Sequence, residues 1–327
     1  MSDINNQDYN PLLEINTSFE SYLKARTRTY TDHVVGGRMD YAFDGDFAMR
    51  SKLNTMNGWN KLYKSITLTE IPNHYKKLFR TADIATSMLF ANAYNAANKC
   101  SERMHLVPPQ VMVKKAKGVP EIYSFSCDGV ETSIVISSDI AEMCTEKELC
   151  YLIGCELGRI QNQHTVYNFA FSALGLTDND EEENAKDSED GSRQLGYTLN
   201  SWLCAADFTA DRAGIICLDD PSDFAETYIS VRKKCIPDSF KKIDPDIDKS
   251  AVMEKFAKVH ATPIRDLSLD AETSQDERRI FAGIEFTGCE VLYNWRPDLN
   301  SSGMHLTGKQ TLEIRCEILA GADRQSV

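Results

Sequence analysis

The chain has 327 residues, which is enough for one large domain or two smaller ones with a sizeable core. Its 49 acidic residues against 36 Lys and Arg give a formal net charge of -13, which argues against nucleic acid and anionic membrane surfaces as general partners. The ten cysteines are scattered and form no C-x-x-C pair, a pattern typical of reduced thiols in a cytoplasmic protein.

The N-terminal part is predicted to lie outside the main domain. Residues 1–16 are rich in Asn, Asp and Ser and predict a disordered arm; they are too polar for a signal peptide, so we expect a cytoplasmic protein. Residues 17–71 mix glycines with aromatic residues, which favours an irregular N-terminal extension that packs on the main domain. Apolar residues at helical spacing then predict a helix from Pro72 to Ser101.

Two β-rich runs follow this helix. They are Gln110 to Lys114 and Glu121 to Ser137, and the second contains the turn signal Asp128-Gly129 before a β-branched segment. We therefore expect a small β-sheet that includes a hairpin.

A second helix is predicted to begin at a capping box formed by Thr145 and Glu148, and to continue to about Ala173. The apolar stretch at its end, residues 166–176, is too short to span a membrane. At ~100° per residue, Glu156 falls within the apolar stripe of this helix, which consists of Leu149, Leu152, Ile153 and Ile160. A carboxylate on a core-facing stripe requires a partner or a function.

An acidic segment and a further helix come next. Residues 178–190 hold eight Asp and Glu against one Lys, which predicts a solvated acidic loop. The following helix, Leu195 to Leu218, places Asp207 within its apolar arc. Two helices are thus expected to direct Glu156 and Asp207 toward a shared interior.

The remaining predicted helices are Phe224–Lys234, Ala251–Val259, Gln275–Leu292 and Lys309–Ala320. We assign residues 72–270 to the main domain and residues 271–327 to a C-terminal helical extension.

The five residues from Cys155 to Arg159 have the spacing of an H-E-x-x-H zinc site. In that motif two histidines four residues apart hold the metal, and the glutamate between them activates water. Here Cys155 and Arg159 occupy the histidine positions, while Glu156 is kept. An arginine stays protonated in a protein, so Arg159 can donate hydrogen bonds but cannot ligate a metal.

Three features in this order match one family. The hairpin is followed by the helix E-L-x-x-L-I-G-C-E-L-G-R-I-x-N-x-H and then by the helix D-F-T-A-D-R-A-G. Together they resemble the HtpX-type and CAAX prenyl protease-type zinc metallopeptidases, whose pattern is H-E-L-G-H-I-x-N-x-H followed by E-F/Y-x-A-D-R-A-G. The resemblance covers residues 72–270. It implies an α+β, mainly helical, zincin-like metallopeptidase fold with a small β-sheet and two core motif helices.

The resemblance also implies positions for the functional residues. The three zinc-ligand positions of the family fall on Cys155, Arg159 and Asp207, and the position of the catalytic base falls on Glu156. Asp211 matches the aspartate that orients the first histidine. Candidate residues of a substrate cleft, placed by the same resemblance, are Tyr123, Phe125, His164, His260 and Arg265.

We expect Arg159 to replace the metal electrostatically by pairing with Asp207, Glu156 or both. Glu156 is then better interpreted as an ion-pair partner of two helices than as a base. Cys155 is either a zinc ligand or nucleophile, or a small buried core thiol, and the buried thiol is favoured.

The leading hypothesis is a catalytically degenerate metallopeptidase-like protein, a pseudopeptidase that binds a protein or peptide partner, with no cofactor expected. The alternative is a zinc-dependent endopeptidase with Cys155 and Asp207 as a non-standard ligand set. A third hypothesis is a structural subunit whose terminal additions mediate oligomerisation or assembly in a complex. Nucleic acid is not expected as a partner, nor is a membrane span.

Overall fold

The computed structural model describes residues 32–116, 118, 120–173, 191–234, 247–270 and 272–321. The predicted arm, 1–16, and the predicted acidic loop, 178–190, lie outside these residues. Two compact units, Met1–Asp40 and Tyr41–Val327, make up the chain. In the first unit, β1 (Val34–Val35) and β2 (Arg38–Met39) form an antiparallel hairpin. Its turn is made by Gly36 and Gly37, whose φ angles of 60° and 80° favour glycine.

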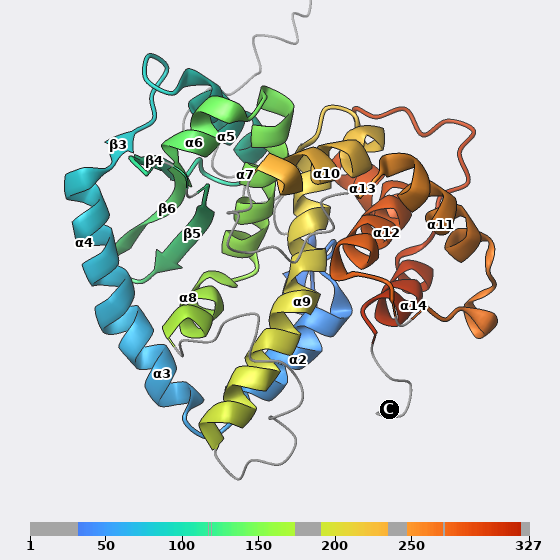
Figure 1. The fold of residues 1–327 in the computed structure, drawn as a ribbon, viewed down its shortest axis with the longest axis horizontal. Coiled ribbons are helices and arrows are strands. Elements are labelled where there is room, and N and C mark those ends of the chain that lie inside the picture. The colour runs from blue at the N-terminus through green and yellow to red at the C-terminus, as the bar shows by residue number, and fades with distance from the viewer. Residues whose placement is uncertain are drawn as a thin grey trace, which may run out of the picture. The chain divides into compact units, whose positions relative to one another are not determined.

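The second unit is mainly helical with one small mixed sheet, which confirms the predicted α+β class (Figure 1). Its four strands pair in the order β3-β4-β6-β5, and only β4 and β6 are parallel. β4 (Gln110–Lys114), β5 (Ile122–Cys127) and β6 (Val130–Ser137) lie in the predicted strand runs, and Gly129 takes a φ of 78° in the predicted turn. The strand β5 forms one edge of the sheet.

Helices α7 (Glu146–Gln161) and α9 (Gly191–Cys217) carry the two motif segments and pack against each other. In Figure 1 they run between the sheet and the helices of the C-terminal part. The capping box predicted for α7 is present, with Thr145 and Glu148 as its two side chains. The helices around this pair are α2 (Asp44–Thr55), α5 (Ala91–Arg103), α6 (Ser138–Met143), α8 (Thr165–Ala173), α10 (Phe224–Lys234), α11 (Lys249–Ala261), α12 (Gln275–Thr287), α13 (Glu290–Trp295) and α14 (Lys309–Leu319), with short 3₁₀ turns at η3 (Pro221–Asp223) and η4 (Ile264–Asp266).

The prediction of a single helix from Pro72 to Ser101 is wrong. Helix α4 (Ile71–Thr81) ends before strand β3 (Asp83–Ile84), which pairs with β4, and the next helix starts only at Ala91. Between them, the Thr86 hydroxyl accepts hydrogen bonds from the backbone N–H groups of Met88 and Leu89. Such a local hydroxyl–backbone bond competes with helical bonding, and helical spacing alone does not reveal it.

The prediction of an irregular segment up to residue 71 is also wrong, because much of it is helical. Besides α2, a continuous helix is formed by α3 (Trp59–Ser65), the π-helical turn η2 (Ile66–Glu70) and α4. The π turn ends at Glu70, two residues before Pro72, and Pro72 stands in the first turn of α4, where its lack of an N–H is tolerated. The predicted packing on the main domain is present, since Leu53, Trp59 and Ile66 belong to the same apolar cluster as strand residues of the sheet.

Two other predicted helices are interrupted. The helix expected to reach Ala173 breaks at Gln163, whose φ is 60°, and the N–H groups of Gln163 and His164 bond back to the carbonyls of Ile160 and Arg159. This is a Schellman ending with a non-glycine residue in the left-handed conformation. The helix expected from Gln275 to Leu292 breaks at Gly288, where the backbone pairs with Thr307. No helix among the described residues is both long and apolar enough to cross a bilayer.

Candidate functional site

The two motif helices approach each other closely because glycines face each other at their crossing. A Cβ added to Gly158 of α7 would lie 2.4 Å from the Cβ of Ala213, and one added to Gly154 would lie 2.7 Å from the Cβ of Cys217. On α9, a Cβ at Gly214 would lie 2.8 Å from the Cys155 sulfur. Real side chains do not tolerate these distances, so the glycines of both motifs set the helix separation.

Arg159 bridges the two helices through an ion pair with Asp207. Its Nη2 donates to Asp207 Oδ1 at 2.9 Å, and its Nε lies 3.5 Å from Glu156 Oε1 one turn back on α7. Burial by itself would lower the pKa of Arg159, but the carboxylates of Glu156 and Asp207 outweigh burial and raise it. The guanidinium is therefore a permanent cation, and the pairing expected from the sequence is present.

A second guanidinium, that of Arg279 on α12, completes the cluster. Its Nη1 donates to the other carboxylate oxygen of Asp207 at 3.0 Å, while Nε and Nη2 bond Asp211 in a bidentate arrangement at 2.8 and 2.7 Å. Its guanidinium carbon also lies 5.1 Å from the ring centroid of Tyr228. Both oxygens of Asp207 thus accept from arginine.

The other two carboxylates of the cluster also have neutral partners. Ser124 on the edge strand β5 donates to Glu156 Oε2 at 2.7 Å, and the Tyr151 hydroxyl donates to Asp211 Oδ1 at 2.6 Å. Glu156 and Asp211 are buried, whereas the Asp207 side chain is 27% exposed. Asp207 is therefore the carboxylate of this cluster that solvent reaches.

Cys155 lies inside the helix pair and is buried. Burial is the main cause that raises the pKa of its thiol, and the nearby Asp211 raises it further, against the opposing effect of Arg159 and Arg279. Because the thiolate is the form that ligates metals and attacks electrophiles, this sulfur is poorly suited to either role.

The residues at the positions where the resembled family binds zinc do not fit this metal. Of the three ligand positions, one holds a protonated thiol, one a cation, and one a carboxylate whose two oxygens are both bonded to guanidinium groups. Zinc requires deprotonated, electron-donating ligands, usually four in a structural site. Among the residues that the structure describes, no group of three or more His, Cys, Asp or Glu side chains is arranged to hold a metal ion.

The five cleft candidates lie in different surroundings. Phe125 is buried in the apolar cluster, and the Tyr123 hydroxyl lies 2.7 Å from His74 Nε2. His164 is buried, and its Nε2 lies 2.9 Å from Asp46 Oδ2, an oxygen that also accepts from Thr209 of α9.

The other two candidates lie in and after α11. His260 Nδ1 lies 3.0 Å from Glu285 Oε1, and Arg265 pairs with the adjacent Asp266. His164 is joined to Arg159 through the backbone bond that ends α7, and none of the side-chain contacts just described connects the five candidates to the side chains of Arg159 or Arg279.

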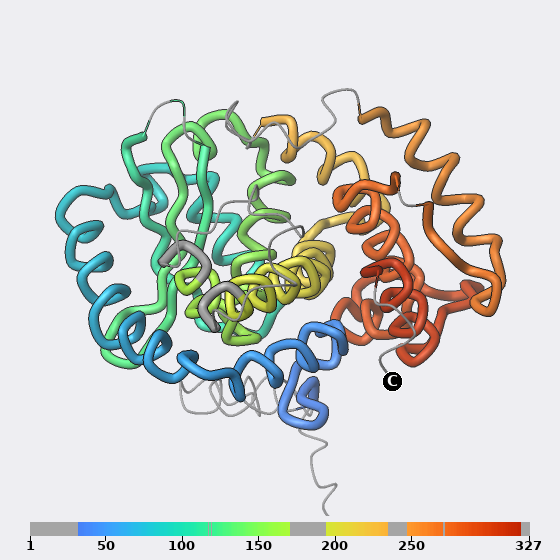
Figure 2. Tube along the Cα trace, turned by 60° about the horizontal axis from the view of Figure 1, so that its bottom comes forward, coloured from blue at the N-terminus to red at the C-terminus, as the bar shows by residue number. Residues whose placement is uncertain are grey.

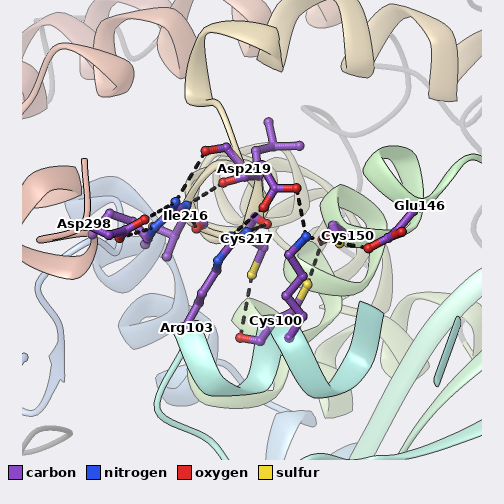
Figure 3. Close-up of polar contacts among 11 residues, drawn as sticks. Cys100, Arg103, Glu146, Cys150, Ile216, Cys217, Asp219 and Asp298 are labelled. Carbon is purple, nitrogen blue, oxygen red and sulfur yellow. Dashed lines mark hydrogen bonds and ion pairs between the residues drawn. The ribbon is translucent and has the colours of Figure 1, made fainter. Parts of the chain in front are cut away.

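The C-terminal end of α9 is held by arginines from two other segments, and Figure 3 shows one of them, Arg103, beside Cys217 and Asp219. Arg103 of α5 donates to the carbonyl of Cys217 and pairs with Asp219 at 2.6 Å. Arg296 donates to the carbonyls of Ile216 and Leu218. The last carbonyls of a helix have no partner within the helix, and cations are favoured there, so these contacts fix the end of the helix that carries Asp207 and Asp211.

Arg279 is the functional residue that the sequence prediction missed. It lies in the segment assigned to a C-terminal extension, although it binds both aspartates of the second motif. A count of charge could have indicated it, because the three inward carboxylates (Glu156, Asp207 and Asp211) outnumber Arg159, the one cation that the sequence predicts to pair with them.

Comparison with known proteins supports a metallopeptidase-like relationship and nothing narrower. No protein-family model matches the chain, and no solved structure matches it. The chain is 22% identical over 237 residues to the plastoglobule-localized metallopeptidase 48, chloroplastic, of Arabidopsis thaliana, a match that covers 68% of this chain and 63% of that protein. The match thus spans less than two thirds of the relative's length. That relative is by name a chloroplast protein, so the cytoplasmic location expected for this chain stays a prediction. At the level that these comparisons support, the chain is similar to a metallopeptidase.

Proposed function

We propose that this protein is a catalytically degenerate relative of the HtpX-type and CAAX prenyl protease-type peptidases, with their zincin-like arrangement. It binds a protein or peptide partner without hydrolysing it. The proposal includes no cofactor. It rests on the similarity to a metallopeptidase and on the residues that this chain has at the three ligand positions, Cys155, Arg159 and Asp207.

The observation that carries the proposal is the double engagement of Asp207. A metal ion bound to this carboxylate would lie beside both Arg159 and Arg279, each of which bonds one oxygen. At ~4 Å and an effective dielectric constant of ~20, one guanidinium repels a divalent ion by roughly 8 kcal/mol. A complete structural zinc site gains only about 10–16 kcal/mol, so two neighbouring guanidiniums offset the whole gain.

Glu156 keeps the position of a general base but has a different set of partners. It accepts from Ser124 and lies beside Arg159, so both of its oxygens are engaged within the protein. A base must be within reach of a proton that it can abstract, and the two Glu156 oxygens that would accept it already face Ser124 and Arg159. Glu156 therefore acts in this proposal as the ion-pair partner that positions Arg159.

The test uses the full chain with fluorescein-labelled casein as the unfolded probe. We expect fluorescence anisotropy to rise on binding, while acid-soluble fluorescence stays at the level of the buffer blank, with or without added zinc. Elemental analysis after dialysis against zinc is expected to find less than one zinc per chain. The Glu156→Gln variant is the matched control, because it keeps the size of the side chain and its contact with Ser124.

Two results would overturn the proposal. Zinc-dependent release of peptides that Glu156→Gln abolishes would establish the alternative, a zinc endopeptidase with Cys155 and Asp207 among its ligands. Absence of casein binding together with a stable homo-oligomer in light scattering would favour the structural-subunit hypothesis.

A further inference from the structure

The continuous helix formed by α3, η2 and α4 has an apolar inner face. Trp59, Ile66, Ile71 and Leu78 are all buried against the core. The π turn lets Ile66 and Ile71, five residues apart, both point inward, since the N–H of Ile71 bonds to the carbonyl of Ile66. With 23 residues from 59 to 81, this helix is about 34 Å long at ~1.5 Å per residue.

The outer face of the same helix is basic and exposed. It carries five basic residues against a single acidic one, Glu70, although the whole chain has a net charge of -13. All five are exposed: Lys61, Lys64, Lys76, Lys77 and Arg80. Among the described residues none of the five has an ion-pair partner, whereas α11 pairs Lys249, Lys255 and Lys258 with carboxylates. We call these five residues the basic face.

Two large apolar side chains lie on the outer side of the helix between these cations. Leu68, in the π turn at the middle of the helix, is 75% exposed, and Phe79 in α4 is 57% exposed. Figures 1 and 2 both show α3 and α4 along a border of the second unit, with α11 on the opposite border. No other described helix of this unit is thus drawn along the outer face in Figure 1 or Figure 2.

We propose that the basic face docks on an anionic lipid bilayer, with Leu68 and Phe79 entering the headgroup region. Helices that bind in the plane of a membrane surface typically carry Lys and Arg beside exposed apolar side chains. An acidic protein would complement the charges but would also need an apolar recess for a single leucine in mid-helix. A bilayer accepts such side chains anywhere along the contact. The contact is peripheral and requires no membrane-spanning helix.

Charge determines the size of the expected effect. Each Lys or Arg near an anionic membrane surface strengthens binding about fivefold, so removing three is expected to weaken it about 100-fold. The attraction falls off within a Debye length, about 10 Å at 0.1 M ionic strength, so added salt releases the protein. The global negative charge opposes binding of any other face and thereby orients the protein.

The experiment is vesicle co-sedimentation of the full chain. Vesicles of phosphatidylcholine with phosphatidylserine are compared with vesicles of phosphatidylcholine alone. The test variant is Lys61→Gln, Lys64→Gln and Lys76→Gln combined. The matched control combines Lys249→Gln, Lys255→Gln and Lys258→Gln on α11, which changes net charge equally. A second variant, Leu68→Ser with Phe79→Ser, keeps every charge. All altered side chains are exposed, and unchanged circular dichroism verifies folding.

We expect salt-sensitive binding to the anionic vesicles only, a loss of about 100-fold in the basic-face variant and a smaller loss in the apolar variant. The α11 control is expected to bind as the wild type does or more weakly by a few fold. Equal binding by the basic-face variant and the control would overturn the proposal. So would capture by soluble polyglutamate without any vesicle binding, which would indicate an acidic protein partner. The outcome is independent of whether the protein hydrolyses peptides.

Discussion

Replacing Arg279 by methionine tests whether the second guanidinium holds the carboxylate cluster together. The change keeps most of the side-chain volume but leaves Asp211, which is buried, with the Tyr151 hydroxyl as its one remaining side-chain hydrogen bond among the described residues. Removing one partner of a buried ion pair typically costs about 3–5 kcal/mol, because the remaining charge is uncompensated. We expect the free energy of unfolding of Arg279→Met to fall by that amount.

The assay is urea unfolding at neutral pH, monitored by circular dichroism, with Arg278→Met as the matched control. Arg278 is the adjacent residue on α12, and its side chain donates to the backbone carbonyls of Thr273 and Leu319 instead of to a carboxylate. Loss of such bonds is expected to cost about 1–2 kcal/mol. If Arg279→Met were no more destabilising than this control, the reasoning would be refuted.

A double variant separates charge from packing. Adding Asp211→Asn to Arg279→Met removes the uncompensated carboxylate while keeping its shape. We expect the double variant to be more stable than Arg279→Met alone, which is the sign of an ionic coupling. A further loss of stability instead would mean that Arg279 acts mainly through its packing on Tyr228.

Three further predictions concern the helix crossing, acid stability and the metal position. Gly158→Ala would place a Cβ 2.4 Å from the Ala213 side chain of α9 and is expected to lower the free energy of unfolding in urea by about 2 kcal/mol. The control is Gly288→Ala, whose added Cβ would lie 3.8 Å from its nearest neighbouring atom; it should change the free energy of unfolding by less than about 0.5 kcal/mol. Burial would raise the pKa of Glu148, but hydrogen bonds, the strongest of them from Lys234, lower it from 4.5 to about 2. The ionised Glu148 is therefore expected to contribute about 1–3 kcal/mol to the free energy of unfolding above pH 4.5, and this contribution is lost as the pH falls toward 2. The Glu148→Gln variant should not show this loss in acid unfolding. Arg159→His alone is expected to gain neither zinc in elemental analysis nor proteolysis of casein, and measurable activity of this variant would contradict the assignment.

Local signals in the sequence predicted much of the fold. The Thr145 and Glu148 capping box, the Asp128-Gly129 turn and the strand runs all depend on neighbouring residues, and each is present. The helix interruptions were missed for the opposite reason. The break after Thr81 depends on pairing of β3 with a strand some thirty residues later, and the one at Gln163 depends on a left-handed conformation that its residue type does not announce.

In the candidate site, too, some contacts depend on local sequence signals and others on how distant helices pack. The pairing of Arg159 with Asp207 was predictable because each side chain lies on the inward face of a helix with a recognisable motif. The role of Arg279 depends on how α12 docks on α9, which helical periodicity does not specify. The spacing does, however, place Arg279 on one face of α12 with Gly283 and Phe286, both of which are buried.

Charge balance explains how three carboxylates can lie together at a site whose donors do not suit zinc. Glu156, Asp207 and Asp211 together carry three negative charges, and Arg159 with Arg279 supplies two positive ones, the same formal charge as a zinc ion. A guanidinium, however, only donates hydrogen bonds and offers no open coordination position for water. Substituting histidine at position 159 therefore removes half of the compensating charge while Arg279 still bonds Asp207. A working metal site would require changes at Arg279 and Cys155 as well, so we expect the single substitution to give a less stable protein and no enzyme.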